Sequence, residues 1–175
     1  MVALEGLEKW LGGVFEGAPK ISDKGRKTIA GIWPWVALVF GVLQILAAIS
    51  LWRVGHTVNQ IVDNLNDYLG TAYGTSITDL NAFYWVSLVV LAVDAVILLA
   101  AFPKLRKFEK GGWDLLFLGA LLNLVYGVFS AFNQYGGVGS LVIQVIVTAF
   151  VLYLLFQIRG LYHGSRPAPT SSDSV

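Results

Sequence analysis

Four runs of apolar residues, each about as long as a lipid bilayer is thick, constrain this chain more than any other feature. They are residues 29–52, 82–102, 113–132 and 138–158. A helix needs roughly 20 apolar residues to cross ~30 Å of hydrocarbon. Lipid offers the backbone no hydrogen-bond partners, so each run must satisfy its own backbone groups as a helix. The sequence therefore predicts an all-α integral membrane protein built as a bundle of four transmembrane helices.

The composition agrees with this prediction. Hydrophobic residues make up 56% of the chain and charged residues only 13%, against roughly 25% charged in soluble domains. The formal net charge of +1 gives no field that would attract nucleic acid. The absence of cysteine excludes disulfides, zinc–thiolate sites and a cysteine nucleophile. We therefore expect the lipid bilayer as the surrounding medium and no nucleic-acid partner.

The basic residues fall on one side of the four runs. Eleven of the twelve lie before the first run, between the second and third, or after the fourth: Lys9, Lys20, Lys24, Arg26, Lys27, Lys104, Arg106, Lys107, Lys110, Arg159 and Arg166. Arg53 alone lies on the other side, in the outer loop 53–81. Loops rich in Lys and Arg stay in the cytoplasm. We therefore expect a multi-pass protein of the cell membrane, specifically a bacterial inner membrane, with both termini cytoplasmic.

This layout of four spans, inside termini and a long first outer loop resembles the tetraspan arrangement of claudin-like proteins. The paired cysteines that those proteins carry in their outer loop are absent here. The resemblance therefore covers topology alone and implies nothing about function.

The segments outside the runs also have patterns. Residues 1–28 are expected to form an amphipathic interfacial segment and a basic cytoplasmic linker. Within residues 2–16 one helical stripe carries Leu4, Leu7, Leu11, Val14 and Phe15, which favours a helix on the inner membrane surface. A helix packed against a partner protein is the alternative. The residues 159–175 are expected to be a disordered cytoplasmic tail, because they are rich in Ser, Pro and Thr.

Two further expectations concern helix ends. The outer loop places apolar residues at helical spacing at Val58, Ile61, Val62, Leu65 and Leu69, which predicts a second short helix that caps the outer end of the bundle. Pro103 follows the second run, and we expect it to end that helix because proline cannot continue the hydrogen-bond ladder.

Polar residues inside the runs are the candidate functional site. Counting along the helices places Asp94, Asn123 and Thr148 near the midplane and Gln44 and Gln144 one layer further out. Each belongs to a stripe of small and polar residues spaced three, four or seven apart, so we expect the stripes to face one another inside the bundle. No Lys, Arg or His lies in any run.

Asp94 is the most informative of these residues, because a midplane charge costs a few kcal/mol. Three interpretations stay open. Asp94 belongs to a proton, cation or polar-solute site, or it is a protonated hydrogen-bond donor between helices, or it meets a basic residue of another subunit. The amides Gln44, Asn123 and Gln144 are also commonly simple links between helices.

The leading hypothesis is therefore a small membrane protein that binds or passes a proton, cation or small polar solute at a site around Asp94. The alternative is a structural or accessory membrane subunit. Four spans enclose little space, so we expect a homo-oligomer or other membrane subunits as partners. The sequence has no G-x-S-x-G, H-E-x-x-H or P-loop signature. We therefore expect no enzyme, catalytic residue, metal or cofactor.

Overall fold

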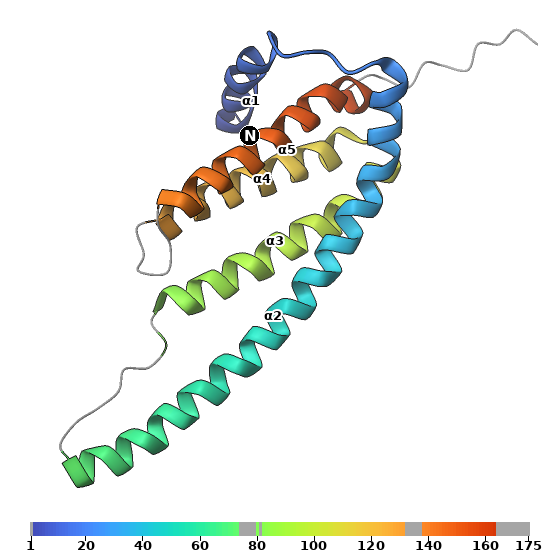
Figure 1. Cartoon of the computed structure of the whole chain (residues 1–175). Helices are drawn as coiled ribbons and strands as arrows, with labels where there is room; N and C mark the ends of the chain where they lie inside the picture. The colour runs from blue at the N-terminus through green and yellow to red at the C-terminus, as the bar shows by residue number, and fades with distance from the viewer. Residues whose placement is uncertain (1, 74–79, 81, 132–137, 164–175) are drawn as a thin grey trace, which may run out of the picture.

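Five α-helices account for almost all of the described chain. The computed structural model describes residues 2–73, 80, 82–131 and 138–163. In chain order the helices are α1 (Val2–Phe15), α2 (Asp23–Tyr73), α3 (Ala82–Arg106), α4 (Lys110–Ala131) and α5 (Val138–His163) (Figure 1). The helices α2 to α5 are each long and apolar enough to cross a membrane. This confirms the predicted all-α chain with four apolar helices, which is the composition of a multi-pass membrane protein.

Helix α2 corrects one expectation. The first span and the second short helix were expected to be separate, but they are one continuous helix of 51 residues. The only helix-weakening residue at their junction is Gly55, and it packs closely against Tyr84 and Trp85 of α3. Tyr84 also donates a 2.6 Å hydrogen bond to the carbonyl oxygen of Leu51. Packing against α3 thus keeps the junction helical. The junction is marked only by the change from apolar to polar residues along α2.

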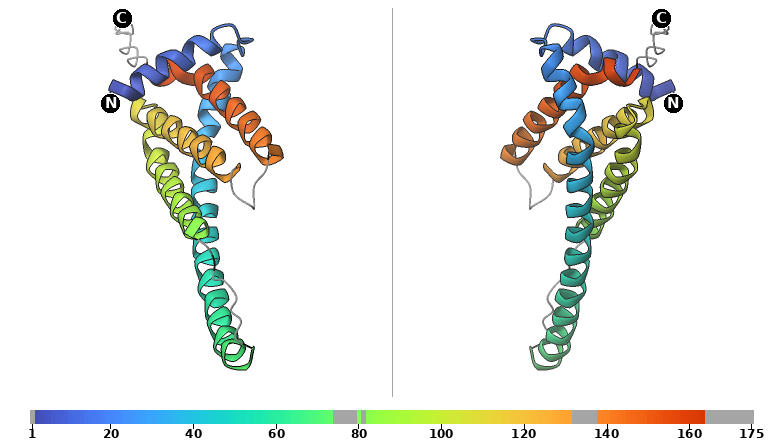
Figure 2. Two further views of the ribbon diagram at one scale, coloured as in Figure 1. Left: turned by 90° about the vertical axis from the view of Figure 1, so that its left-hand side faces the viewer. Right: turned by 90° about the vertical axis from the view of Figure 1, so that its right-hand side faces the viewer.

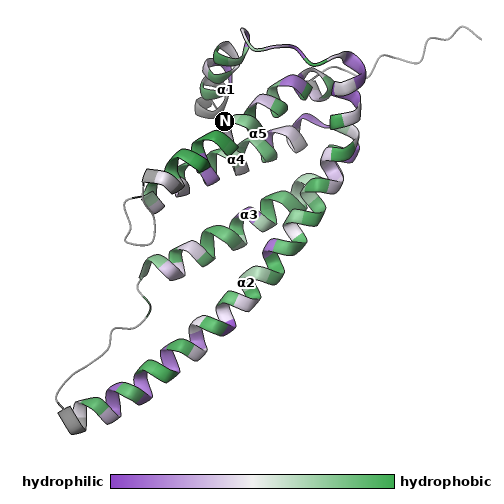
Figure 3. Cartoon of the chain, in the orientation of Figure 1, coloured by the Kyte–Doolittle hydropathy of each residue, from purple (hydrophilic) through white to green (hydrophobic). Residues whose placement is uncertain are grey.

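The outer part of α2 therefore extends away from the other helices instead of capping them. From Gly55 to Tyr73 it covers about 27 Å at 1.5 Å per residue. Figures 1 and 2 show this part projecting well beyond the start of α3. In Figure 3 its hydrophilic and hydrophobic residues alternate along the ribbon, whereas α3 is hydrophobic over most of its length. This segment, residues 55–73, is called the α2 extension below.

Two prolines lie inside helices, and Pro103 was expected to end one. Helix α3 instead continues to Arg106. It ends where Phe108 adopts a left-handed φ of 54°, while Phe108 N–H and Glu109 N–H donate to the carbonyls of Leu105 and Lys104. This pair of hydrogen bonds is a Schellman cap. Proline removes one donor but does not prevent a further turn from forming.

Pro34 lies inside α2, where its missing N–H leaves the carbonyl of Ala30 without the usual helical partner. The hydroxyl of Tyr162 in α5 donates a 3.2 Å hydrogen bond to that carbonyl. Ala30 and Tyr162 are both buried. A tertiary contact therefore replaces the hydrogen bond that proline removes.

The helices pack in chain order, α2 on α3, α3 on α4 and α4 on α5, and α2 touches α5 only lightly. The best-buried core lies at one end, around Trp113, Phe117 and Leu155. The indole N–H of Trp113 donates to the carbonyl of Leu155 at 2.8 Å. This end also carries the start of α2, the α3–α4 connection and the end of α5, where the basic residues cluster. We call it the basic end.

Helix α1 lies across the basic end and packs on α5 (Figure 2). The ring of Phe15 stacks on Phe156 with centroids 5.4 Å apart, and the buried carboxylate of Glu8 forms an ion pair with Arg159. The predicted helix is thus present and contacts its own chain. On its other side Leu7, Trp10 and Val14 are exposed. That exposed apolar face is compatible with a membrane surface, and this location stays a prediction.

Candidate functional site

Asp94 lies at the centre of the bundle. It belongs to α3, and its side chain is only 4% exposed. Its Oδ2 accepts a 2.9 Å hydrogen bond from Nε2 of Gln44 in α2. Among the described residues neither Oδ1 of Asp94 nor Oε1 of Gln44 accepts a hydrogen bond. The α2–α3 contact therefore presents two buried acceptor oxygens that lack a donor.

The other three polar residues predicted from the sequence form a second group, on α4 and α5. Nε2 of Gln144 donates to the carbonyl of Asn123 at 3.2 Å and lies 3.4 Å from Oγ1 of Thr148. The amide of Asn123 donates to the carbonyl of Gly119 at 3.0 Å. Thr148 is buried. The contact between Gln144 and Asn123 links α4 to α5, and the other two lie within a single helix.

Two glycines bring α4 close to both groups. A Cβ atom at Gly119 would lie 3.1 Å from Oδ1 of Asp94, which is tighter than ordinary contact. A Cβ atom at Gly127 would overlap Cγ of Gln144. Small residues let membrane helices approach closely. Here they place the α4 backbone directly against the side chains of Asp94 and Gln144.

One cavity of about 420 Å³ contacts all five predicted residues, Gln44, Asp94, Asn123, Gln144 and Thr148. The structure therefore brings together the residues that the sequence stripes placed on facing surfaces. The remaining lining is mostly apolar and runs toward the basic end, as far as Trp33 and Leu155. A small number of polar groups in an apolar cavity is the usual composition of a ligand site.

A second cavity, of about 260 Å³, lies on the other side of Asp94. It is also lined by Gln44, Asp94 and Asn123, and it runs away from the basic end to Leu51 and Tyr84. The carboxylate of Asp94 thus lies between two cavities that extend toward opposite ends of the bundle. They are called the basic-end cavity and the far cavity below.

Sequence reasoning missed two residues of the far cavity, Ser87 and Tyr126. Both line it, and the Tyr126 hydroxyl donates a 2.9 Å hydrogen bond to Oγ of Ser87. Tyr126 was not among the five site residues predicted from the sequence. The available signal was its position three residues after Asn123, which puts both side chains on one face of α4.

The basic-end cavity opens sideways between α2 and α5. These two helices meet near the basic end and diverge from there (Figure 2). Phe40 of α2 and Val147 of α5 line the cavity, yet they are 56% and 52% exposed. In a membrane this opening faces the hydrocarbon, so a single chain does not seal the polar site from lipid.

No family model matches the chain, and comparison with curated proteins and with solved structures gives no match either. The fold and the site define the class by themselves: a small all-helical protein with four helices that can span a membrane and a polar cluster in the middle of them. Within the described residues no three His, Asp or Glu side chains gather closely enough to hold a metal ion.

Proposed function

We propose that the chain binds a proton, a small cation or a small hydrogen-bond-donating solute at Asp94 and passes it between the two cavities. The observation that carries the proposal is the pair of buried oxygens without donors, Oδ1 of Asp94 and Oε1 of Gln44. A buried acceptor without a partner costs roughly 1–3 kcal/mol. A proton or cation removes that cost, whereas an anion would add repulsion.

The two cavities support passage rather than mere retention. Each contacts Asp94, Gln44 and Asn123, and they leave this group in opposite directions. A ligand on Asp94 is thus adjacent to both. The function proposed is binding and passage, without catalysis of a chemical reaction.

The orientation proposed follows from the basic end. It gathers Lys and Arg from three separate segments, and such segments remain cytoplasmic. The proposed location is a bacterial inner membrane with both termini inside. The basic-end cavity then faces the cytoplasm and the far cavity faces outward.

The sideways opening supports the proposal that the working form is a homo-oligomer. A polar solute needs a path closed against hydrocarbon, and a second copy beside α2 would supply the missing wall. One face of α2 carries Phe40, Val54, Ile61 and Tyr68 at multiples of seven residues, and all four are more than half exposed. Seven-residue spacing is the pattern by which two parallel helices pack together.

The α2 extension strengthens the choice of a second copy as the partner. Two copies in one bilayer, inserted with the same orientation, place their α2 helices parallel and at the same height, so identical stripes meet in register. The charged residues nearby, Arg53, Asp63 and Asp67, lie off this stripe. Because Phe40 is both in the stripe and at the cavity opening, the same contact would pair the extensions and cover the opening.

Crosslinking tests this arrangement, since the chain has no native cysteine. Ile61→Cys should give disulfide-linked dimers in native membranes under mild oxidation. Asp63→Cys, two residues away on the opposite face, is the matched control and should stay monomeric. Equal crosslinking of both variants would indicate random collision and would contradict the paired stripe.

The rival function is an accessory subunit in which Asp94 is protonated and serves as a link between helices. Its support is the contact that already joins Asp94 to Gln44. Two substitutions separate the functions. Asp94→Asn keeps the shape and an acceptor for Gln44 but cannot exchange a proton or balance a cation. Asp94→Leu removes the acceptor as well.

The assay is proton or monovalent-cation flux in liposomes that contain the purified protein. Asp94→Asn should fold normally and lose flux, while the exposed control Asp63→Asn should keep it. Under the rival function Asp94→Asn changes little and only Asp94→Leu is damaging. Wild-type flux no higher than in empty liposomes, for every ion tried, would count against passage.

A further inference from the structure

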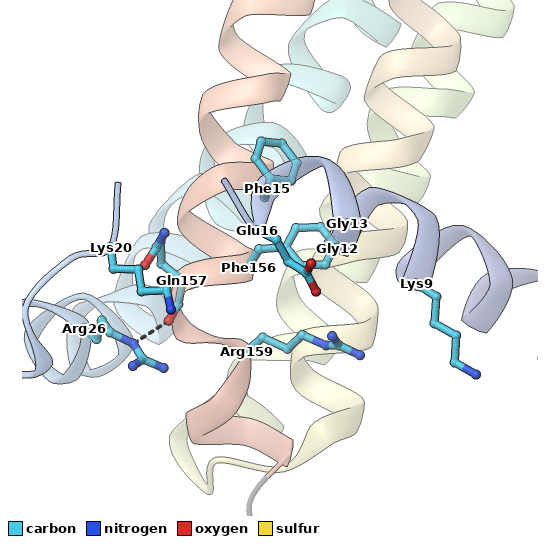
Figure 4. A pocket seen from close by; sticks show the side chains of 10 residues that line it. All are labelled: Lys9, Gly12, Gly13, Phe15, Glu16, Lys20, Arg26, Phe156, Gln157 and Arg159. Atoms are coloured by element: carbon cyan, nitrogen blue, oxygen red, sulfur yellow. Dashed lines mark hydrogen bonds between the residues drawn. The ribbon is translucent and has the colours of Figure 1, made fainter. Parts of the chain in front are cut away.

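A third cavity lies at the basic end, away from the Asp94 site. It has a volume of about 730 Å³ and lies between α1, the segment that follows α1, and the last turns of α5. Phe15 and Phe156 form its apolar part, and Gly12 and Gly13 form a stretch of wall without side chains (Figure 4). None of the five residues of the Asp94 site touches it.

The lining carries more cations than acids. Four cations contribute to it and one acid does: Lys9, Lys20, Arg26 and Arg159, with Glu16. Glu8 is paired with Arg159, and the largely exposed Asp23 lies 3.4 Å from Arg26. With Glu8 and Asp23 added to Glu16, four cations face three carboxylates. The ion pair between Asp23 and Arg26 is too exposed to neutralise much charge. The cavity therefore attracts anions.

Two of the cations are held in place by the fold. Nε of Arg26 donates a 2.6 Å hydrogen bond to the carbonyl of Gln157 (Figure 4). A guanidinium carries five donors in a planar fork, and the contacts of Arg26 with Gln157 and Asp23 use two of its nitrogens. Arg159 is anchored by the buried Glu8. Arg26 and Arg159 come from segments more than 130 residues apart, so the fold itself assembles the cavity.

We propose that this cavity binds a phosphate group. Planar guanidinium groups with flexible lysines beside them are the side chains that recognise phosphate oxygens best. The glycine pair lets such a group approach the α1 backbone closely. The cavity faces Lys9, Gly12 and Glu16, on the side of α1 away from the exposed Leu7, Trp10 and Val14. The phosphate therefore arrives from the aqueous and headgroup layer, either free in solution or as the headgroup of a phospholipid.

Two pairs of variants test the site on the full-length protein. Lys9→Ala with Lys20→Ala removes two lining cations, and Lys24→Ala with Lys27→Ala removes the same charge nearby, outside the cavity. Gly13→Leu adds a side chain at the cavity wall, where a Cβ would meet no atom within 4 Å. Gly6→Leu is its control, since Gly6 is equally open, lies on the same helix and does not line the cavity. Leucine favours a helix more than glycine does, so neither change should unfold α1.

The measurement is the ligand-dependent rise of the thermal unfolding midpoint in uncharged detergent. The probes are inorganic phosphate, compared with chloride at equal ionic strength, and short-chain phosphatidylglycerol, compared with a short-chain diacylglycerol, which lacks the phosphate. Wild type and both controls should be stabilised by binding. The lining variants should bind at least about tenfold more weakly, because each charge-assisted hydrogen bond accounts for about that factor.

The two probes distinguish the sources. Stabilisation by inorganic phosphate assigns the site to a soluble phosphate, and stabilisation by phosphatidylglycerol alone assigns it to a lipid headgroup. No stabilisation by either probe would overturn the proposal. Equal losses in the two double-lysine variants, or in Gly13→Leu and Gly6→Leu, would also overturn it, since the effect would then be independent of the cavity.

Discussion

Gly127→Ala is the sharpest stability test of the α4–α5 contact. The added Cβ would overlap Cγ of Gln144 and lie 3.2 Å from its Cδ. These atoms are near the root of the side chain, so Gln144 must rotate away from α4. It then loses its contacts with the Asn123 carbonyl and the Thr148 hydroxyl.

The size of the effect follows from three contributions. The hydrogen bond from Gln144 to the Asn123 carbonyl joins α5 to α4, and hydrogen bonds between membrane helices average about 0.6 kcal/mol each. Overpacking adds roughly 1–3 kcal/mol. Replacing glycine by alanine in a helix returns up to about 1 kcal/mol. The net expected destabilisation is therefore about 1–3 kcal/mol.

Reversible unfolding in mixed micelles, followed by circular dichroism, measures this difference. Gly31→Ala is the matched control, because a Cβ at Gly31 would meet no atom within 4 Å. The control should be unchanged or slightly stabilised. If Gly127→Ala proved as stable as Gly31→Ala, the close approach of α4 to Gln144 would be refuted.

Two further predictions concern orientation and the proline in α2. With the basic end cytoplasmic, Lys107→Cys should resist an impermeant thiol reagent in intact cells while Gln60→Cys reacts, and the reverse pattern would invert the topology. Tyr162→Phe should cost about 0.6–1.7 kcal/mol of unfolding free energy in mixed micelles. The reason is that the Ala30 carbonyl loses the hydroxyl donor that replaces its missing helical partner. An unchanged unfolding free energy would show that this contact is not a stabilising one.

The apolar helices could be predicted from sequence because lipid permits few alternatives. An uninterrupted run of some 20 apolar residues has to satisfy its own backbone, and only a helix does so within one segment. The convergence of Gln44, Asp94, Asn123, Gln144 and Thr148 was predictable for a related reason. Polar residues avoid lipid, so stripes of them at helical spacing point inward together.

The continuity of α2 and the assembly of a cavity from distant segments were not predictable in the same way. The polar stretch after Trp52 resembles a loop, and nothing local shows that Tyr84 and Trp85 would hold Gly55 in a helix. The cavity between α1 and α5 was missed because its basic residues were interpreted as markers of topology. Arg26 and Arg159 are far apart in the chain, and only the packing of α5 beside α2 brings them to one cavity.

Helix α2 connects the three regions discussed above. It contributes Arg26 to the cavity between α1 and α5, Gln44 to the Asp94 site and Ile61 to the exposed stripe. A continuous helix transmits a tilt or rotation along its whole length, except where its hydrogen-bond ladder is interrupted. The interruption in α2 is at Pro34, between Arg26 and Gln44, and Tyr162 closes it from α5. Along α2, a change at the cavity between α1 and α5 therefore reaches Gln44 through the turn that Tyr162 stabilises, whereas Gln44 and the exposed stripe belong to one uninterrupted segment and must move together.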